Sequence, residues 1–409
     1  MSGREAVVVT GLGVVSSLGD SAAALHAALC AGQSGLGPPP ALEWTTVGCR
    51  VAGALRDFRP ERYLGADANL RPLDRTGRLL AAAAGLALAD SGWTAERRSG
   101  IEIGLVAGTL FGSLATVSGF DCRALTAGPS YVKPLDFANT VFNAAAGQTA
   151  IWHRLGGLNA TLGGASAGLE AISFAAQQIA AGRADVVLAG GVEELCAESV
   201  LAFARAGLLC DERPIPFAAE RNGFALGEGA ALLVLERASR AENRGARILG
   251  TIGGDGRRFD PSRGADEQAI VAAVADAVAE ALRRSRIEPA AIDAWSASAS
   301  GGRLDLAEAL GVARVLGEGA VRLPVAAVKA QLGETLGAAG AFQVAALIES
   351  GRTGRLPGIP GLERPDPRLP MALAGPAARE LRPRRGLATS LGLDGQVAAL
   401  VVELPEPRP

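Results

Sequence analysis

Few residues of this sequence have the type and spacing that acid–base or nucleophilic chemistry needs. The chain holds only two histidines, His26 in an Ala-rich stretch and His153 in the segment IWHRLGG. Neither lies in a motif suited to general acid–base catalysis, and we interpret both as packing or surface residues. Five cysteines are scattered without a CxxC pair, a pattern that favours reduced thiols over disulfides or a zinc site. They are Cys30, Cys49, Cys122, Cys196 and Cys210.

Length and composition exclude several functional classes. The chain has 409 residues, 49% hydrophobic and 20% charged, which is typical of an α/β protein with two compact halves. A net charge of -2 and an aromatic content of 4% speak against nucleic-acid binding. The N-terminus does not read as a signal peptide, and no apolar run is long enough for a membrane span. The glycine-containing segments GLGVVSSLG and GTLFGS match neither a dinucleotide fingerprint nor a phosphate loop. We therefore expect a cytoplasmic protein with no metal, no cofactor and no nucleic-acid or membrane partner.

A strand–helix–strand unit is predicted to carry the turn at which a nucleophile would stand. Residues 5–15 and 186–189 are apolar runs that end at glycines, as strands of a parallel sheet covered by helices do. Between them, residues 167–181 carry apolar side chains at helical spacing, and Gly182 stands where a helix would end. Together they form a βαβ unit.

The second half of the chain repeats this plan. Residues 339–351 resemble residues 167–182, and residues 393–403 resemble residues 227–236. These echoes indicate an internal duplication, with halves at residues 1–248 and 249–409. The Pro- and Arg-rich stretch 352–385 is predicted to be irregular, with one short strand at Met371–Ala374.

Segments along the whole chain resemble the β-ketoacyl synthase family. They are VVVTGLGVVSSLG (7–19), GRADVVLAGGVEE (182–194), PFAAERNGFALGEGAALLVLE (216–236) and VKAQLGETLGAAG (328–340). Their order and spacing agree with the family's pattern. The resemblance implies an α/β thiolase fold, in which duplicated βαβαβαββ halves stack as five αβαβα layers. It also implies an obligate dimer.

The resemblance identifies three catalytic positions, and none holds the residue that condensation needs. Ketosynthases use a cysteine at a helix N-terminus, held as thiolate, and two histidines. The matching segments place Ala165 at the cysteine, Ala297 at the first histidine and Glu334 at the second. A methyl group cannot hold a thioester, and a carboxylate cannot stabilise developing negative charge. Ser166 lacks a neighbouring base, so we interpret it as the cap of the following helix.

Other charged positions of the family are retained. Asp305, Glu308 and Lys329 match residues that in the family support the site from behind. If they lie together, they form a paired, buried network, because an isolated buried charge is costly. A scaffold retained without its chemistry favours a selected non-catalytic role.

The resemblance therefore predicts a chain length factor. Such a subunit resembles an active ketosynthase, forms a heterodimer with it and lines the far end of a tunnel at the interface. An acyl carrier protein supplies the phosphopantetheine-linked acyl chain, and side-chain bulk in the tunnel limits extension. Carried onto this chain through the match at residues 128–132, the tunnel positions are Leu114, Val117, Asp121 and Ala138. Ordinary core and interface packing remains the alternative for these four residues.

Two departures from the family's sequence pattern indicate which branch of the family the chain resembles. Aromatic-type factors usually carry Gln at the nucleophile position, where this chain has Ala165, and the family's terminal G-F-G-G is replaced by residues 392–395, G-L-D-G. Both departures favour a reducing system that makes polyenes or aryl polyenes. Two other functions stay open: a malonyl-carrier decarboxylase that uses the same pocket, and a non-enzymatic scaffold.

Overall fold

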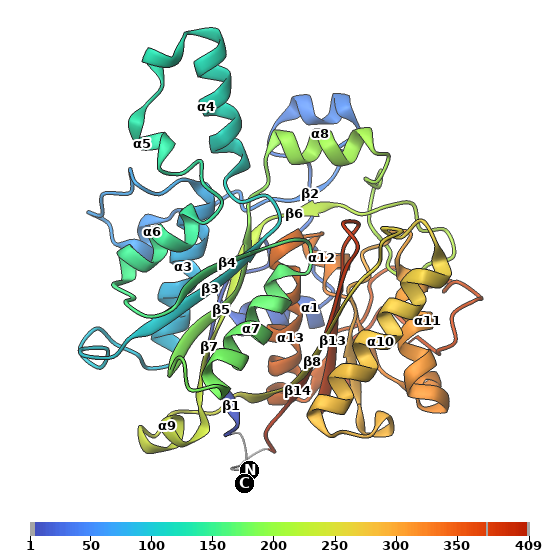
Figure 1. The fold of residues 1–409 in the computed structure, drawn as a ribbon. Helices are drawn as coiled ribbons and strands as arrows, with labels where there is room; N and C mark the ends of the chain where they lie inside the picture. Colours follow the sequence, from blue (N-terminus) through green and yellow to red (C-terminus); the bar gives the residue numbers. More distant parts are fainter. Residues whose placement is uncertain (1–4, 374, 407–409) are drawn as a thin grey trace.

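The chain folds into two halves that repeat one order of elements, βαβαβαββ. The structure is a computed structural model that describes residues 5–373 and 375–406 (Figure 1). The first half consists of β1 (Val7–Ser16), α3 (Arg75–Asp90), β3 (Ile103–Thr109), α6 (Ala144–His153), β4 (Asn159–Gly163), α7 (Ala167–Ala180), β5 (Val186–Glu193) and β7 (Gly229–Arg237). The second half consists of β8 (Gly250–Phe259), α10 (Glu267–Ser285), β9 (Ala294–Ser296), α11 (Asp305–Leu316), β10 (Val325–Ala326), α13 (Ala339–Thr353), β13 (Arg385–Leu391) and β14 (Gln396–Glu403).

The strands of each half follow the same spatial order. The first half is ordered β1-β7-β5-β3-β4, and the second is ordered β8-β14-β13-β9-β10. In each half two strand pairings are parallel, β5 with β3 and β3 with β4 in the first half and β13 with β9 and β9 with β10 in the second. The last strand of each half, β7 or β14, runs antiparallel to both of its neighbours. The two sets join where Val7, Val8 and Val9 of β1 pair antiparallel with β8. This leaves β4 and β10 at the two edges.

Helices complete five layers. Helices α7 and α13 pack on each other between the two sets of strands. Helices α3 and α6 cover the outer face of the first set, and α10 and α11 cover that of the second (Figure 1). The predicted thiolase fold with duplicated halves is therefore confirmed. Residue 248 lies between α9 and β8, and the boundary drawn there stays a prediction.

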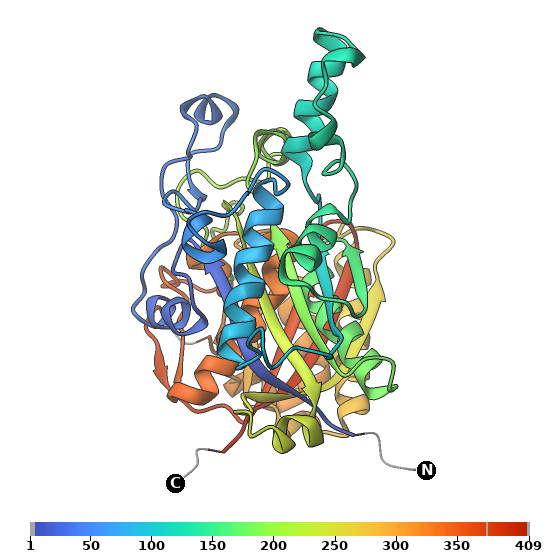
Figure 2. The same cartoon turned by 90° about the vertical axis from the view of Figure 1, so that its left-hand side faces the viewer.

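The remaining elements are short or lie outside these layers. Helices α4 and α5 project as an arm beyond the layered body, as both views show (Figures 1 and 2). The remaining helices and strands are α1 (Ala22–Cys30), α2 (Glu61–Leu64), α4 (Leu114–Thr126), α5 (Pro134–Phe137), α8 (Ala197–Arg205), α9 (Ala238–Asn243), α12 (Lys329–Leu332), β2 (Ala52–Gly53), β6 (Leu226–Gly227), β11 (Arg355–Leu356) and β12 (Arg379–Glu380). Five 3-10 helices are η1 (Leu42–Val47), η2 (Pro129–Tyr131), η3 (Pro289–Ala291), η4 (Gly317–Arg322) and η5 (Leu336–Ala338).

The stretch before β13 differs from the sequence prediction. Residues 371–373 form no strand, and residue 374 lies outside the described residues. The strand pair of this stretch is instead β11 with β12, which bracket the Pro-rich loop. The predicted strand was wrong because the run at Met371 packs its side chain into the second-half core without a strand partner.

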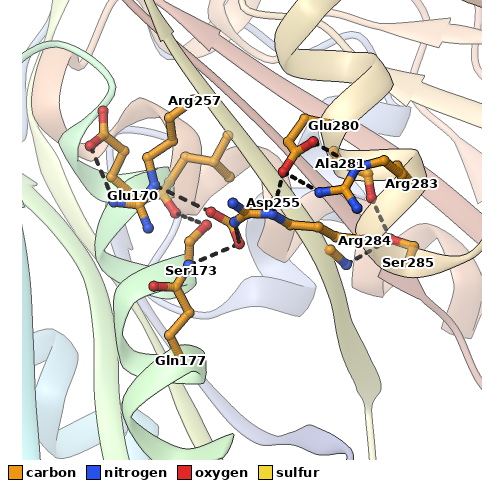
Figure 3. Close-up of polar contacts among 12 residues, drawn as sticks. Glu170, Ser173, Gln177, Asp255, Arg257, Glu280, Ala281, Arg283, Arg284 and Ser285 are labelled. Carbon is orange, nitrogen blue, oxygen red and sulfur yellow. Dashed lines mark hydrogen bonds and ion pairs between the residues drawn. The ribbon is translucent and has the colours of Figure 1, made fainter. Parts of the chain in front are cut away.

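A buried polar bridge ties the central helix α7 to the second half (Figure 3). The carboxylate of Asp255 on β8 accepts a hydrogen bond from Gln177 Nε2 of α7 at 2.9 Å. It also pairs with Arg257 at 3.3 Å and with Arg284 of α10 at 3.2 Å. Because a buried carboxylate is stable only with such partners, the bridge fixes α7 relative to β8 and α10.

The N-terminal end of α7 is held by close backbone packing. A Cβ on Gly168 would collide with the carbonyl oxygen of Gly337 in η5. Only glycine therefore allows the first turn of α7 to lie directly against η5. This contact brings the residues before α7 next to the segment that contains Glu334.

Candidate functional site

A pocket of about 690 Å³ opens where the two halves meet at the N-terminal end of α7. Ala165, just before α7, forms part of its wall, together with residues that follow β3 and β9 and the end of β13. Its lining is mainly apolar, as in most sites for small organic groups. The charged side chains at the pocket come from the stretch between α8 and β6, the loop after β9 with the start of α11, the loop after β10, the stretch between β11 and β12, and the turn after β13.

Ala165 occupies the turn that leads into α7. Its backbone N–H donates to Asp394 Oδ2 at 2.9 Å. Gly164 before it has φ 137, a conformation that side chains rarely adopt. The methyl group of Ala165 faces the pocket, so this wall offers no nucleophilic atom.

Ser166 does not take the place of the missing nucleophile. Its side chain is fully buried, and its hydroxyl donates to Glu170 of α7, with Gln396 Oε1 3.0 Å away as the alternative acceptor. Although Ser166 stands at the N-cap position, its side chain makes no capping hydrogen bond. The predicted capping role was wrong, because the hydroxyl is directed at Glu170 and Gln396 instead of at the N–H groups of the first turn.

The two positions matched to histidines lie close to Lys329, whose Nζ contacts Glu334 and Ser298, the residue after Ala297. Ala297 is fully buried after β9, and its neighbours Ser298 and Ala299 line the pocket. Glu334 lines the pocket directly. Its Oε1 accepts a hydrogen bond from the backbone N–H of Leu336 at 3.0 Å, which fixes the carboxylate.

Lys329 is paired with Glu334, the residue at the position that the resemblance matches to the second histidine. Its Nζ lies 2.7 Å from Glu334 Oε2, and both side chains are largely buried. The same Nζ donates to Ser298 Oγ at 3.0 Å. Each partner compensates the burial of the other. At this wall of the pocket Glu334 is therefore engaged in a closed ion pair.

Glu308 of α11 lies behind this pair. Its Oε1 accepts hydrogen bonds from the backbone N–H of Ser298, at 2.7 Å, and from the hydroxyl of Thr389. Burial raises its pKa to about 8, and the nearby charge of Asp305 acts in the same direction, while Lys329 opposes it. At neutral pH this carboxyl group is mostly protonated.

Asp305, at the start of α11, ties down the loop that follows β9. Burial raises its pKa, although three backbone donors stabilise its charged form. These donors are the N–H groups of Phe217, Ser300 and Gly301. Asp305 and Glu308 thus line the pocket, and the buried Lys329 is connected to Glu308 through Ser298. Lys329 forms its ion pair with Glu334 rather than with Asp305 or Glu308.

Both histidines lie away from the pocket. His26 is buried in α1, where its Nε2 is 3.0 Å from the carbonyl oxygen of Arg355 and 3.2 Å from Ser350 Oγ. His153 ends α6, and its Nε2 is 2.8 Å from the carbonyl oxygen of Ala81. Burial lowers the pKa of each imidazole. Both are packing residues.

The five cysteines differ in how far they are buried. All five are free, and only Cys122 on α4 is exposed. Cys196, at the start of α8, is buried, and burial raises the pKa of its thiol to about 11. Its thiol is therefore inert at neutral pH.

The four tunnel positions lie on the projecting arm. Leu114 and Val117 on α4 are half-buried, whereas Asp121 on α4 and Ala138 after α5 are exposed. None of the four contributes to the wall of the 690 Å³ pocket. In a single chain they form an open surface, so any tunnel along them needs a second wall from a partner.

Two residues that the sequence did not single out contact the nucleophile turn. Asp394 binds the N–H of Ala165, and the side-chain amide of Gln396 donates to the carbonyl oxygen of Gly163 at 3.0 Å. The signal available in the sequence was the replacement of a glycine by aspartate in the segment 392–395.

Within residues 5–373 and 375–406, His, Cys, Asp and Glu side chains form no group of three that could hold a metal ion. No helix in the same part of the chain combines the length and the apolar character needed to cross a bilayer.

Comparison with known proteins identifies similar sequences along most of the chain. The pattern described as "Beta-ketoacyl synthase, N-terminal domain" matches residues 4–241, and that of the C-terminal domain matches residues 251–363. The 3-oxoacyl-[acyl-carrier-protein] synthase 2 of Vibrio cholerae is 30% identical over 97% of this chain and 99% of its own length. The tetracenomycin polyketide synthase ketoacyl synthase beta subunit of Streptomyces glaucescens is 31% identical over 98% of this chain and 99% of its own.

A solved structure shares the fold closely. The ishigamide ketosynthase/chain length factor superposes with a TM-score of 0.91 at 28% identity, over 98% of this chain and 100% of that one. Sequence and structural comparisons therefore agree on one family over nearly the full length.

Proposed function

The chain belongs to the β-ketoacyl synthase family, and we propose that it is a non-catalytic member that acts as the chain length factor of a ketosynthase heterodimer. Its partner in this proposal is an active ketosynthase subunit, to which an acyl carrier protein delivers a phosphopantetheine-linked acyl chain. We also propose residues 1–248 and 249–409 as its duplicated halves, and the cytoplasm as its location. The departures at Ala165 and residues 392–395 favour a polyene or aryl polyene pathway.

One observation carries this proposal. The chain has a mainly apolar pocket beside Ala165, but the three positions that the resemblance matches to catalytic residues carry none of the side chains that condensation uses. Ala165 has no sulfur to hold a thioester, and Ala297 is buried and apolar. Glu334 is negative and is already paired with Lys329 at 2.7 Å. With no imidazole at the pocket, malonyl decarboxylation also lacks a group to stabilise its enolate.

The distribution of exposed apolar side chains supports a partner. In the described part of the chain, ten large hydrophobic residues are exposed, and seven of them lie between residues 125 and 151. They are Leu125, Tyr131, Leu135, Phe137, Val141, Phe142 and Ile151, which we call the arm surface. A concentration of this kind marks a protein–protein interface. The neighbouring strand β4 is an unpaired sheet edge, which is also suited to a second subunit.

The open position of the tunnel residues fits a shared tunnel. Leu114, Val117 and Ala138 lie on the arm, where this chain leaves the first two half-buried and Ala138 exposed. In the proposed heterodimer the ketosynthase supplies the opposite wall. The growing acyl chain then meets these side chains, and their volume sets where extension stops.

Co-expression with a candidate ketosynthase, followed by native mass spectrometry, tests the proposal. We expect a 1:1 heterodimer in which acyl groups are attached only to the ketosynthase cysteine. A stable homodimer that ignores the ketosynthase would replace this proposal with the scaffold function. Turnover of malonyl-carrier by the isolated chain well above background would replace it with the decarboxylase function.

The tunnel positions make a separate prediction. Ala138→Phe should shorten the product by at least one extension unit, because the added ring occupies space that the acyl chain needs. Ala138 is exposed, so the ring does not disturb this chain's own core. Ala290→Phe, at an exposed position of the second half, is the matched control. Mass spectrometry of the released products measures chain length, and an unchanged length with Ala138→Phe would contradict the assignment.

A further inference from the structure

The hairpin between β13 and β14 places an aspartate at the N-terminal end of α7. The turn is closed by a hydrogen bond from Gly395 N to Gly392 O at 3.0 Å. Asp394 Oδ1 accepts from the backbone N–H of Gln396 at 3.1 Å. Its other oxygen, Oδ2, accepts from the backbone N–H of Ala165 at 2.9 Å. The carboxylate is thus held at both oxygens, between the hairpin and the nucleophile turn.

The backbone N–H of Ala165 is the kind of donor that an acyl-transfer pocket uses to bind a substrate oxygen. Backbone donors at the start of a helix lack intrahelical partners and attract anions, an effect that the helix dipole reinforces. Stabilising a thioester oxygen that becomes negative requires such donors to be free and aimed into the pocket. Ala165 lies in the pocket wall, but its donor is taken by a carboxylate of the same chain.

Two glycines make room for the contact between Asp394 and Ala165. A Cβ on Gly392 would lie 2.5 Å from Ala165 Cβ and would also collide with Asp394. A Cβ on Gly164 would collide with the Gln396 side chain, which covers the other side of the turn. Glycine at both positions therefore allows the hairpin to pack directly on the nucleophile turn.

We propose that Asp394 is an internal anion that occupies the N-terminal end of α7 and closes this part of the pocket to acyl thioesters and anionic substrates. In this proposal the chain is inactive for two reasons: it lacks the nucleophile, and the Asp394 carboxylate occupies the N–H group that would bind a substrate oxygen. This inference rests on the proposed absence of catalysis, and it does not depend on a chain-length role or on a partner. It predicts that a cysteine restored at position 165 stays unreactive while Asp394 is present.

Cysteine alkylation in the full chain tests the inference. Ala165→Cys is introduced alone, with Asp394→Gly and with Asp394→Asn, all in a Cys122→Ser background that removes the exposed thiol. The rate of iodoacetamide labelling at residue 165 is measured by peptide mass spectrometry across pH. The thiolate displaces iodide, so the rate follows the thiolate fraction.

The carboxylate is expected to control this rate. With Asp394 present, the negative charge should hold the thiol pKa at or above its ordinary value. Asp394→Gly should lower the thiol pKa and raise the labelling rate at pH 7 at least tenfold, because the helix N-terminus then favours the thiolate. Asp394→Asn, which keeps the size and a carbonyl acceptor but removes the charge, should also increase the rate and keeps the test valid if the glycine variant misfolds.

Two outcomes would overturn the proposal. One is equal labelling rates with and without Asp394, and the other is a rapidly labelled thiol in the Ala165→Cys variant alone. Glu318→Gly, which removes an exposed acidic residue far from the pocket, is the control for net charge. The experiment needs neither a ketosynthase nor a product, so its failure is distinguishable from a failure of the heterodimer test.

Discussion

Raising the pH from 5 to 9 is expected to lower the chain's free energy of unfolding by about 4 kcal/mol through Glu308 alone. Burial raises the pKa of this carboxyl from 4.5 to about 8 in the folded chain. Between these two values the folded state binds a proton that the unfolded state has released. Stability therefore falls as the pH rises through this window, and the loss is complete above about pH 8.

Glu308→Gln isolates this contribution. The amide keeps an oxygen that can accept from Ser298 and Thr389, but it cannot ionise. The variant should match the wild type near pH 5 and exceed its stability by several kcal/mol at pH 9. Urea unfolding at both pH values measures the difference. Glu193 and Glu194, whose pKa values burial raises to about 7, titrate in both proteins and cancel in the comparison.

A carboxylate on the surface of α10 provides the control for Glu308→Gln. Glu280→Gln removes a carboxylate on the surface of α10 and should leave the pH dependence of stability close to that of the wild type. If Glu308→Gln follows the same pH dependence as the wild type, then Glu308 is ionised in the folded chain. In that case, the attraction of Lys329 would outweigh the cost of burial.

The sequence predicted the fold because the fold is repeated within it. The resemblance of residues 227–236 to residues 393–403 corresponds to β7 and β14, which take the same place in the two halves. The helix predicted at residues 167–181 is α7, which ends one residue earlier, and Gly182 adopts φ 72 beyond it. Apolar periodicity and terminal glycines are local signals, so they predict an element from a short stretch of sequence alone.

Pairings at the site depended on features that the sequence does not display. Lys329 was expected to join Asp305 and Glu308, but α12 ends at Leu332 and the chain turns at Gly333, with φ 85. This turn carries Glu334 back against Lys329. The contact between Ala165 and Asp394 joins residues 229 positions apart and depends on the shape of a hairpin. Neither contact has a periodic signature.

The tunnel positions illustrate a different limit. Spacing placed Leu114, Val117 and Asp121 on one helix, and the structure has them on α4. Whether their side chains become buried depends on a second polypeptide, because α4 has no buried residue in this chain. Asp121 is exposed on the arm, where water solvates its carboxylate. Burial at an interface is a property of two sequences rather than one.

Phe137→Asp and Ile151→Asp, each made alone, are expected to weaken heterodimer formation at least 100-fold, or by about 3 kcal/mol. The exposed fractions are 61% for Phe137 and 74% for Ile151, so neither side chain is needed for the core of the chain. In the proposed complex they become buried, where an apolar side chain of this size contributes about 1.5 to 3 kcal/mol. An aspartate there adds the cost of desolvating a charge without a partner.

Phe259→Asp is the matched control for this prediction. Phe259 is exposed to a similar degree, 59%, but lies at the end of β8 and outside the arm surface. Native mass spectrometry and analytical ultracentrifugation of the co-expressed subunits measure the heterodimer, and circular dichroism of each variant reports its fold. Loss of the complex with Phe137→Asp and Ile151→Asp, but not with Phe259→Asp, assigns the interface to the arm surface. Equal effects of all three would show general destabilisation, and wild-type affinity of both arm variants would place the ketosynthase elsewhere, leaving the exposed tunnel positions without an opposite wall.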